Sequence, residues 1–479
     1  MSKSILIILS FCISTGLLAQ LDSQKKAIVS DIDSKQDEYF ATALEIWNYA
    51  EVGYQEEKSS TLLKGKLSKH GFSIEEGVAD IPTAFVASYG EGKPVIAILG
   101  EFDALPGVAQ TASPFREKRD DVTAGHACGH HLFGAGSMAA AIEVKQWMES
   151  NDIEGTLRFY GTPAEEGGAG KVYMVREGLF EDVDAVLHWH PGNSNGANAA
   201  SSLANKSAKF RFYGVASHAA GSPWNGRSAL DGVEAMNMMV NMMREHVSHD
   251  SRIHYVITSG GEAPNVVPEF AEVFYYCRHP EMRMVRQNFD WIVEIAEAAA
   301  KGTKTRMEFE VIHGLFNVLP NETLARVVHG NLSELGGYEY TEEEKAYAEK
   351  IVESFEYASN VSLSTTKNVA PFRVIPKGQG GSTDVGDVSW AVPTAGLRTA
   401  TWVPGTSAHT WQAVAAGGTT IGKKGMILAA KTLALSAVDF YRDKELLAKA
   451  KEELDRLRGS DFVYESLLGD REPPLDYRK

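Results

Sequence analysis

The sequence of 479 residues predicts an α/β protein with two domains. Three observations lead to this fold class. Over residues 21–203, helical patterns are followed by short apolar runs that alternate with helical segments, as in a sheet covered by helices. Over 204–320 the order changes to β-α-β-β-α-β, which is typical of a small α+β sandwich. Patterns of the first kind return over 321–479, so we expect the smaller domain to be inserted into the larger one.

The composition excludes some classes of partner. Hydrophobic residues make up 44% of the chain and charged residues 23%, which is typical of a globular protein. The formal net charge is -16. Because nucleic acid and anionic membrane surfaces repel so acidic a chain, we expect neither as a binding partner.

Residues 1–20 have the pattern of a secretory signal peptide. Lys3 precedes the apolar run 5–19, which is short for a bilayer-spanning helix, and a polar segment follows. We expect cleavage near Ala19 or Gln20 and an exported, periplasmic protein that has no membrane span after processing. The alternative is an uncleaved membrane anchor formed by the same apolar run.

Helices and strands follow in the order expected of an α/β domain. Apolar residues recur at helical spacing over 31–70, and Ser59 with Ser60 is expected to cap a second helix in that range. The apolar runs 83–87 and 94–99 predict strands, the second of them buried.

Three predicted strands, 94–99, 155–161 and 184–187, each lead into side chains that can bind a metal. These side chains are Glu101 and Asp103 after the first strand, Glu165 and Glu166 after the second, and His188 and His190 after the third. The carboxyl ends of neighbouring strands are the usual place for an α/β active site. A solvated loop explains the first pair equally well by itself, but the repetition over three strands predicts a shared site.

The segment 125–131, Gly-His-Ala-Cys-Gly-His-His, contains three imidazoles and one thiol. Thiolate and imidazole suit zinc and neighbouring metals, and carboxylates widen the choice to manganese or cobalt. Cys128 and His130 can point the same way because they stand two residues apart. For this segment alone, the alternative is a packed cysteine with surface histidines. A disulfide between Cys128 and Cys277 is disfavoured because Cys128 lies among histidines.

The inserted segment contains four predicted strands and two predicted helices. In chain order their ranges are 208–214, 229–246, 253–258, 271–278, 285–300 and 305–313. The first of the two helices carries a stripe of methionines, namely Met236, Met239, Met242 and Met243. Such a stripe predicts packing in a core or at a subunit interface.

The last third of the chain returns to the larger domain. Its predicted elements are helices over 321–335 and 342–358, a strand over 392–399 and a long helical region from residue 425. A Gly-rich segment, 378–387, precedes the strand, and His409 follows it. From Lys444 onward the chain is highly charged, which predicts a solvated helix and arm.

Eight motifs together resemble one family. They are GEFDALPGVAQ (100–110), GHACGHH (125–131), TPAEEGG (162–168), HWHPG (188–192), SHAAGSPWNGRSALDGVEAM (217–236), GGEAPNVVPEFAEVFYYCR (260–278), GSTDVGDVSW (381–390) and PGTSAHTWQAV (404–414). The sequence resembles the metal-dependent aminoacylase and carboxypeptidase family of two-domain peptidases. The resemblance covers nearly all of the chain after residue 20. It implies an α/β catalytic domain with a mixed sheet and an inserted ferredoxin-like lid that mediates dimerisation.

The resemblance implies a site for two divalent metal ions, which are zinc or manganese, with cobalt as a further choice. It assigns five metal ligands: Cys128, His130, Glu166, His190 and His409. Some relatives carry the fourth ligand at the position of His188, and we favour His190 because the nearest relatives carry it directly before the proline. The sequence departs from many relatives at His131, where they have Asp, and this changes a contact behind the metal ligands.

Glu165 falls on the general base of the family. A carboxylate beside metal ions takes a proton from water and later delivers it to the leaving amine. His218, on the lid, resembles a residue that reaches the site of the partner subunit and stabilises the oxyanion. The alternative for His218 is a loop histidine with satisfied hydrogen bonds.

Further residues resemble the part of the site that holds the substrate. Asn265 and Arg278 on the lid resemble binders of a substrate carboxylate, which a guanidinium grips with two hydrogen bonds. A structural ion pair is the alternative for Arg278. The turn Ser382-Thr383-Asp384 is expected to line the site near His409, although backbone capping alone also explains such a turn.

We therefore expect a metal-dependent amidohydrolase that cleaves an N-acyl or N-aroyl amino acid, with p-aminobenzoyl-glutamate as one candidate. The expected oligomer is a homodimer through the lid, and a paralogous partner subunit is an alternative. One rival function is a dipeptidase or carboxypeptidase on the same scaffold. The other is a non-catalytic binding subunit, against which the intact Cys128, Glu165 and His409 argue.

Overall fold

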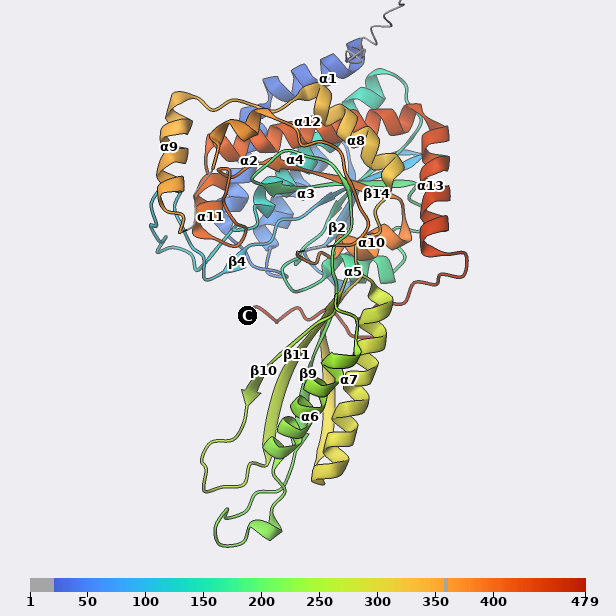
Figure 1. The fold of residues 1–479 in the computed structure, drawn as a ribbon. Coiled ribbons are helices and arrows are strands. Elements are labelled where there is room, and N and C mark those ends of the chain that lie inside the picture. Colours follow the sequence, from blue (N-terminus) through green and yellow to red (C-terminus); the bar gives the residue numbers. More distant parts are fainter. Residues whose placement is uncertain (1–20, 357–360, 379) are drawn as a thin grey trace, which may run out of the picture.

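The structure is a computed structural model that describes residues 21–356, 361–378 and 380–479. The predicted signal peptide, residues 1–20, lies outside the described residues. A rounded larger domain carries an elongated smaller domain, the lid, that projects from it (Figure 1). Each of the two parts has a hydrophobic core of its own.

A six-stranded sheet forms the centre of the larger domain. Its strands are β1 (Ser73–Glu76), β2 (Phe85–Glu91), β3 (Val95–Gly100), β6 (Gly155–Gly161), β7 (Ala185–Gly192) and β14 (Thr394–Ala400), in the spatial order β1-β2-β6-β3-β7-β14. Strands β6, β3, β7 and β14 run parallel, and β1 and β2 add an antiparallel edge. The predicted α/β fold with a mixed sheet is confirmed.

Helices cover both faces of this sheet. They are α1 (Ser23–Ser34), α2 (Gln36–Tyr49), α3 (Glu57–Lys69), α4 (His130–Ser150), α5 (Gly170–Arg176), α8 (Glu322–Leu335), α9 (Glu342–Glu353), α10 (Val385–Ala391), α11 (Trp411–Gly417), α12 (Thr420–Arg442) and α13 (Lys444–Arg458). Helices α4 and α12 lie on one side of the sheet, and α5 and α10 lie on the other (Figure 1). Among the described residues, no helix is both long and apolar enough to cross a membrane.

Helix α4 is buried along most of its length, as its run of small residues predicts. Gly134 shows why small residues are needed, because a Cβ there would lie 2.8 Å from the carbonyl oxygen of Glu101. The close approach fixes the start of α4 against the end of β3. The residues that precede α4 and follow β3 are therefore held side by side.

Two local predictions are wrong. Helix α3 begins at Glu57, so Ser59 and Ser60 lie inside its first turn instead of capping it. Their hydroxyls donate to the Glu51 carboxylate and to the Thr83 carbonyl. Strand β7 continues to Gly192, so the two histidines expected after it lie within it.

The lid contains β9 (Ala204–Tyr213), α6 (Ala229–Met243), β10 (Arg252–Ser259), β11 (Phe270–His279), α7 (Met282–Thr303) and β12 (Arg306–Leu315). The predicted β-α-β-β-α-β order is confirmed. The four strands form an antiparallel sheet in the order β10-β11-β9-β12, with both helices on one face (Figure 1). This is the strand order of a ferredoxin-like fold.

Some methionines of α6 lie in the core of the lid, and others are exposed on its surface. Met236 and Met243 are buried in the core of the lid, whereas Met242 is 60% exposed. Met238, which lies outside the predicted stripe, is 62% exposed. Cys277 is also buried in this core, and neither it nor Cys128 forms a disulfide.

The predicted solvated arm at the C-terminus is wrong. After α13 the chain turns back across the base of the lid, where Leu467 is buried in the core of the lid and Leu468 in the core of the larger domain. Further along, the ring of Tyr477 packs edge-on against Tyr54, with ring centroids 5.6 Å apart. A high local content of charge does not show where scattered apolar residues will dock.

Candidate functional site

The predicted metal-binding side chains meet at the carboxyl ends of the parallel strands. A cavity of about 560 Å³ opens there, and Cys128, Glu165, Glu166, His190 and His409 all line it. Strands β3, β6 and β7 bring their terminal residues to this edge because they run parallel. Cys128 lies just before α4 and His130 is the first residue of that helix, so both approach this edge from the same side.

Cys128 is shared by two groups of ligand atoms. One group contains Cys128, His130 and His190, and the other contains Cys128, Glu166 and His409. Within each group the ligand atoms lie within 4.8 Å of one another. Two such groups around one thiol could hold two metal ions, with Cys128 available as a ligand to both.

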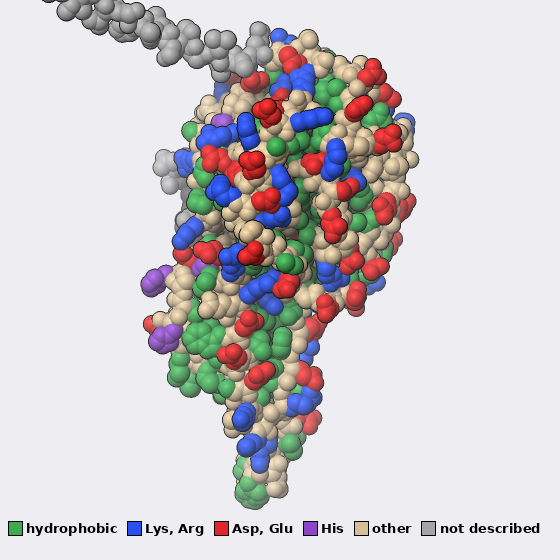
Figure 2. All heavy atoms as spheres, turned by 90° about the vertical axis from the view of Figure 1, so that its right-hand side faces the viewer, with side chains coloured by type: hydrophobic (Ala, Val, Ile, Leu, Met, Phe, Trp, Pro, Cys, Tyr) green, Lys and Arg blue, Asp and Glu red, His purple; other side chains and the backbone are tan. Residues whose placement is uncertain are grey.

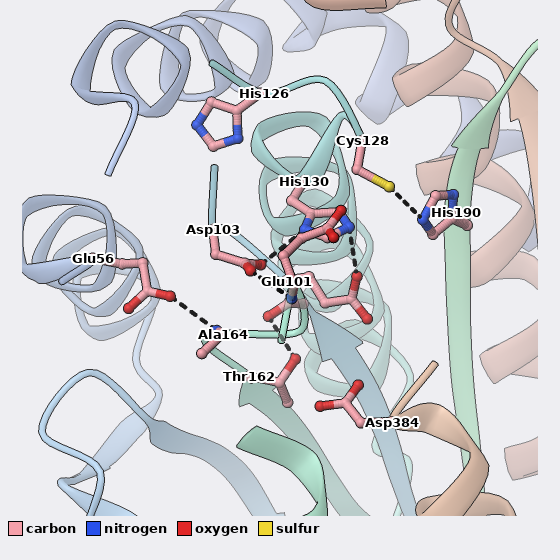
Figure 3. Close-up of polar contacts among 12 residues, drawn as sticks. Glu56, Glu101, Asp103, His126, Cys128, His130, Thr162, Ala164, His190 and Asp384 are labelled. Atoms are coloured by element: carbon pink, nitrogen blue, oxygen red, sulfur yellow. Dashed lines mark hydrogen bonds and ion pairs between the residues drawn. The ribbon is translucent and has the colours of Figure 1, made fainter. Parts of the chain in front are cut away.

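Two buried carboxylates surround His130 (Figure 3). Its Nδ1 lies 2.8 Å from Asp103 Oδ1, and its Nε2 lies 3.1 Å from Glu101 Oε2. Burial alone would lower the pKa of His130, but the charges of Cys128, Glu101 and Asp103 outweigh burial and raise it well above its usual value. The surroundings therefore favour a positive charge at this imidazole, whether a proton or a metal ion carries it.

The turn that carries Glu165 and Glu166 is held at both ends. Ala164 has a φ of 58°, which is rare for a residue other than glycine. Its amide donates to the buried carboxylate of Glu56 over 2.9 Å (Figure 3). The amide of Glu166 donates to Asp103 Oδ2 over 2.9 Å. A backbone conformation that costs energy persists because these contacts hold it, as is common at functional sites.

Glu165 points into the cavity without a hydrogen bond to any described residue. Burial, followed by the nearby carboxylates of Glu101 and Glu166, raises the pKa of Glu165 well above its usual value. A carboxyl group with a raised pKa is suited to accept and return a proton.

The structure distinguishes the two histidines of β7. His190 Nε2 lies 3.3 Å from Cys128 Sγ, and its Nδ1 lies 2.7 Å from the carbonyl oxygen of Pro191 (Figure 3). His188 lines the cavity but belongs to neither ligand group around Cys128. This geometry favours His190 as the ligand, and the assignment remains a prediction.

His409 reaches the site from a loop after β14. Its Nε2 lies 3.0 Å from Glu166 Oε1, and its amide donates to the carbonyl of Ala127 over 2.9 Å. It has a φ of 64°, which again is rare outside glycine. The hydrogen bond to the Glu166 carboxylate is the main reason that the pKa of His409 is raised.

Asp384 does not fit its predicted substrate-binding role. It is buried, and both of its oxygens accept from Lys171, Oδ1 from Nζ over 2.7 Å and Oδ2 from the amide over 3.0 Å. Ser382 and Thr383, in contrast, line the cavity. The physical reason is that the fully buried Lys171 needs carboxylate partners.

Lys171 is a component of the site that the sequence does not reveal. Its ammonium lies 2.7 Å from Glu101 Oε1 as well as 2.7 Å from Asp384 Oδ1. Despite burial, the charges of Asp384 and Glu101 raise the pKa of Lys171. Lys171 therefore neutralises a carboxylate beside the metal ligands. No signal in the local sequence distinguishes this lysine from a surface lysine of α5.

The lid residues predicted at the site lie away from the cavity in this chain. His218 and Asn265 are in the loops that join β9 to α6 and β10 to β11, at the end of the lid far from the larger domain (Figure 1). His218 is exposed, and its Nδ1 accepts from the amides of Ala220 and Gly221. One chain alone does not bring His218 or Asn265 to the metal ligands.

Arg278 lies at the opposite end of β11, near the larger domain, and does not line the cavity. Its guanidinium is 5.1 Å from the ring of Tyr276. Within the described ranges it forms no ion pair, which removes the alternative of a structural ion pair with those residues.

Arg398 is a cavity residue that the motifs do not include. It lies on β14, is exposed, and is the only lysine or arginine among the described residues that line the cavity. In the parallel pairing of β14 with β7 it stands beside His190. The sequence around Arg398 does not indicate a role in the site, because that role depends on the pairing of β14 with β7.

The site fits metal ions by the chemistry of its donor atoms. His130 Nε2, Glu101 Oε2 and Glu166 Oε1 are buried, and their close contacts with charged groups among the described residues, His130 with Glu101 and Glu166 with His409, lack good hydrogen-bond geometry. Without a cation, burial raises the pKa of the Cys128 thiol to about 12. A metal ion would satisfy these atoms and deprotonate the thiol, and the start of α4 also favours a thiolate.

Comparison with known proteins agrees with this geometry. Residues 97–413 match the family described as peptidase family M20/M25/M40. One subunit of the p-aminobenzoyl-glutamate hydrolase of Escherichia coli K12 is 42% identical over 448 residues, which cover 88% of this chain and 93% of that protein. The Xaa-Arg dipeptidase of Mus musculus is 29% identical over 92% of this chain and 94% of its own.

A solved structure shows the same fold. A dinuclear metal-binding peptidase of Bacillus subtilis aligns with a TM-score of 0.58 and 18% identity over 86% of this chain and 99% of its own. The family match spans well over half of the sequence and contains the cavity ligands from Cys128 to His409. The chain therefore belongs to peptidase family M20/M25/M40 and is a metal-dependent hydrolase.

Proposed function

We propose that the protein is a dinuclear amidohydrolase that cleaves N-aroyl or N-acyl amino acids, with p-aminobenzoyl-glutamate as the first substrate to test. The observation that carries this proposal is the pair of ligand groups that share Cys128, with Glu165 beside them. The identity of 42% to one chain of a p-aminobenzoyl-glutamate hydrolase supports the substrate.

Two divalent ions held by Cys128, His130, Glu166, His190 and His409 would supply a water of low pKa and polarise the substrate carbonyl. Zinc and manganese both suit this donor set, and cobalt is a further choice. Asp103 orients His130 through Nδ1, which fixes the ring so that Nε2 lies on the side of Glu101 and within the ligand group of Cys128 and His190.

Glu165 performs the proton transfers of the reaction. Its carboxylate takes a proton from the attacking water and then delivers it to the amine that leaves. The buried Lys171 and Glu101 pair next to Glu165 controls the local charge. The resulting products are a carboxylic acid and an amino acid.

The lid supports a dimer that would complete the site. Strand β10 is an edge of the lid sheet, and it exposes Val256 by 64% and Ile257 by 42%. Met238 and Met242 of α6 are exposed as well, and exposed apolar side chains beside an open sheet edge favour pairing with another chain. Figure 2 shows hydrophobic side chains gathered on the lid below the larger domain.

In such a homodimer, His218 of each lid reaches the metal site of the other copy, where it stabilises the oxyanion. The exposed position of His218 at the far end of the lid supports this arrangement. A paralogous chain in place of the second copy is the alternative, since the relative from Escherichia coli is named as one subunit of a hydrolase.

Export to the periplasm belongs to the same proposal. Lys3 and the apolar run 5–19 support it, because together they have the pattern of a cleavable signal peptide.

A dipeptidase is the second candidate function, because the chain is also 29% identical to an Xaa-Arg dipeptidase. Hydrolysis of p-aminobenzoyl-glutamate and of Ala-Arg by purified protein, with zinc, manganese or cobalt added, separates the two. We expect release of p-aminobenzoate and no cleavage of the dipeptide. Cleavage of the dipeptide alone would establish the second candidate. A protein that hydrolyses neither compound and copurifies with substoichiometric metal would support a non-catalytic binding role.

A further inference from the structure

Arg398 and His188 form a polar subsite within the cavity that the metal ligands do not use. The pairing of β14 with β7 places Arg398 beside His190 and Gly396 beside His188, so Arg398 and His188 project from the same face of the sheet. Gly396 leaves room for the His188 ring, because a Cβ there would lie 2.3 Å from His188 Nε2. The ring thus lies over β14 next to the start of the Arg398 side chain.

Neither side chain has a partner that explains its presence. Within the described residues, Arg398 forms no ion pair and its guanidinium makes no hydrogen bond, and His188 makes no side-chain hydrogen bond. Arg398 is exposed to solvent, so the fold does not require a partner for it, and its guanidinium is available to bind a carboxylate of a ligand in the cavity. The charged residues that share the cavity with Arg398 are Glu101, Glu165 and Glu166, and the first of these is already paired with Lys171.

The position of Arg398 matches one part of the proposed substrate. Neighbouring strands lie about 4.8 Å apart, so the stem of Arg398 begins close to His190, and the side chain lines the cavity. The substrate carbonyl must lie at the metal ligands, and the amino-acid half extends away from them. A carboxylate at the end of an amino-acid side chain is thus within reach of the guanidinium.

We infer that Arg398, with His188 beside it, binds the side-chain carboxylate of the substrate and makes the enzyme selective for conjugates of acidic amino acids. This inference rests on the proposed function, and it names the substrate class of the same site. The guanidinium grips the carboxylate with two hydrogen bonds, and the neutral imidazole of His188 donates a third. A neutral side chain of equal size would leave Arg398 unpaired.

A matched pair of substrates tests the subsite. p-Aminobenzoyl-glutamate and p-aminobenzoyl-glutamine have nearly the same shape and differ by one charge. We expect the wild-type enzyme to prefer the glutamate conjugate, and Arg398→Met to reduce the ratio of the two kcat/KM values by about 10- to 100-fold, as for a hydrogen bond to a charged group. Arg398→Lys should retain part of the preference, because it keeps the charge but loses the planar fork.

The control is Arg456→Met on α13, which removes an exposed arginine far from the cavity and should leave the ratio unchanged. Competitive inhibition by free glutamate and free glutamine repeats the comparison without turnover. An equal loss of activity toward both conjugates would show that Arg398 binds the α-carboxylate or only supports the fold, and would overturn the inference. Equal rates for both conjugates in the wild type would do so as well. Failure to hydrolyse any N-aroyl amino acid would instead contradict the proposed function.

A second observation concerns the C-terminal segment 459–479, which links the lid to the turn that carries Glu166. At the base of the lid, Arg471 Nη1 donates to the carbonyl of Ile312 over 2.9 Å. A Cβ on Gly314 would lie 2.8 Å from Leu467 Cβ, so the two chain segments are in close contact there. The segment is therefore anchored on β12.

The segment then ends at the metal site. Tyr477 OH donates to the carbonyl oxygen of Glu166 over 3.1 Å, and Arg478 Nη2 donates to the same oxygen over 2.9 Å. Gly53 is required beside them, because a Cβ would lie 2.2 Å from Tyr477 OH. Two donors on one carbonyl hold the backbone of a proposed metal ligand from outside the cavity.

The geometry points to Tyr477 and Arg478 as positioning residues that set the orientation of Glu166. Tyr477→Phe keeps the ring on Tyr54 and removes only the hydroxyl, Arg478→Met removes the guanidinium, and a chain that ends at Asp476 removes both. We expect kcat to fall about 5- to 10-fold in each single variant and further in the truncated chain. KM should change by less than about 2-fold, because no cavity residue is altered.

Metal content distinguishes a positioning role from a general loss of stability, because a loss of stability alone would not weaken the binding of only one of the two metal ions. We expect one of the two metal ions to bind more weakly in the truncated chain and in Tyr477→Phe, and the latter variant, which keeps the ring on Tyr54, should leave the unfolding temperature of the metal-free protein unchanged. Removal of Lys479 alone is the control, because its side chain makes no contact among the described hydrogen bonds and ion pairs. Unchanged kcat and unchanged metal content in the truncated chain would overturn this assignment, as would equal weakening of both metal ions together with a lower unfolding temperature.

Discussion

Replacing Glu165 by glutamine removes the proposed base and keeps the shape of the side chain. Glu165 lines the cavity and has no hydrogen bond to another described residue, so the amide breaks no contact that the structure shows. A positioned acid–base group is worth about 10²- to 10⁴-fold in rate, or about 2.7 to 5.4 kcal/mol of activation free energy. We expect kcat of Glu165→Gln to fall by this factor while both metal ions stay bound.

The same substitution should not destabilise the protein. Burial and the carboxylates of Glu101 and Glu166 raise the pKa of Glu165, which means that the folded state disfavours its charged form. A neutral glutamine removes that unfavourable charge. The metal-free variant should therefore unfold at the same temperature as the wild type or at a higher one.

Glu166→Gln is the matched control, because it makes the same chemical change one residue further along. Glu166 belongs to the ligand group with Cys128 and His409, and a neutral amide binds a metal ion more weakly than a carboxylate. Activity of Glu166→Gln should recover in part in excess metal, and activity of Glu165→Gln should not. The assay is kcat and metal stoichiometry across a metal titration. Full rescue of Glu165→Gln by metal would refute the assignment of the two roles.

Three further predictions concern other parts of the chain. Burial raises the pKa of Asp387 to about 7, so its contribution to stability is complete below about pH 4 and is lost as the pH rises to about 7. Urea unfolding of Asp387→Asn should show a smaller loss of stability over this range than the wild type, and equal losses would contradict the pKa. His190→Ala should lower the metal content in elemental analysis more than His188→Ala, and the reverse order would assign the ligand to His188. N-terminal sequencing of periplasmic protein should begin near Gln20 or Leu21, and an intact initiator methionine on soluble cytoplasmic protein would exclude export.

Much of the fold was predictable because its signals are local. The buried strand before Glu101, the strand before Glu165 and the β-α-β-β-α-β order of the lid all appear as short apolar patterns with turns between them. The convergence of the metal-binding residues followed from the rule that parallel strands end at one edge of the sheet. Cys128 and His409 were expected together for a different reason, because the resemblance to the family assigns both as metal ligands.

The parts that were not predictable depend on contacts between distant segments. Lys171 is a site component only because α5 brings it against Glu101 and Asp384. Arg398 faces the cavity only because β14 pairs with β7 in one register. The charged tail after Lys444 gave no indication that Tyr477 would reach Glu166. In each case the side chain acquires its role from a partner that is far away in the sequence.

The central claim is that Cys128 is shared by two metal ions. Anomalous X-ray scattering from crystals of the zinc-loaded protein tests it most directly. We predict two peaks about 3.5 to 4 Å apart, each about 2.3 Å from Cys128 Sγ, with His130 and His190 on one ion and Glu166 and His409 on the other. A single peak, or a second ion with no contact to Cys128, would contradict the account.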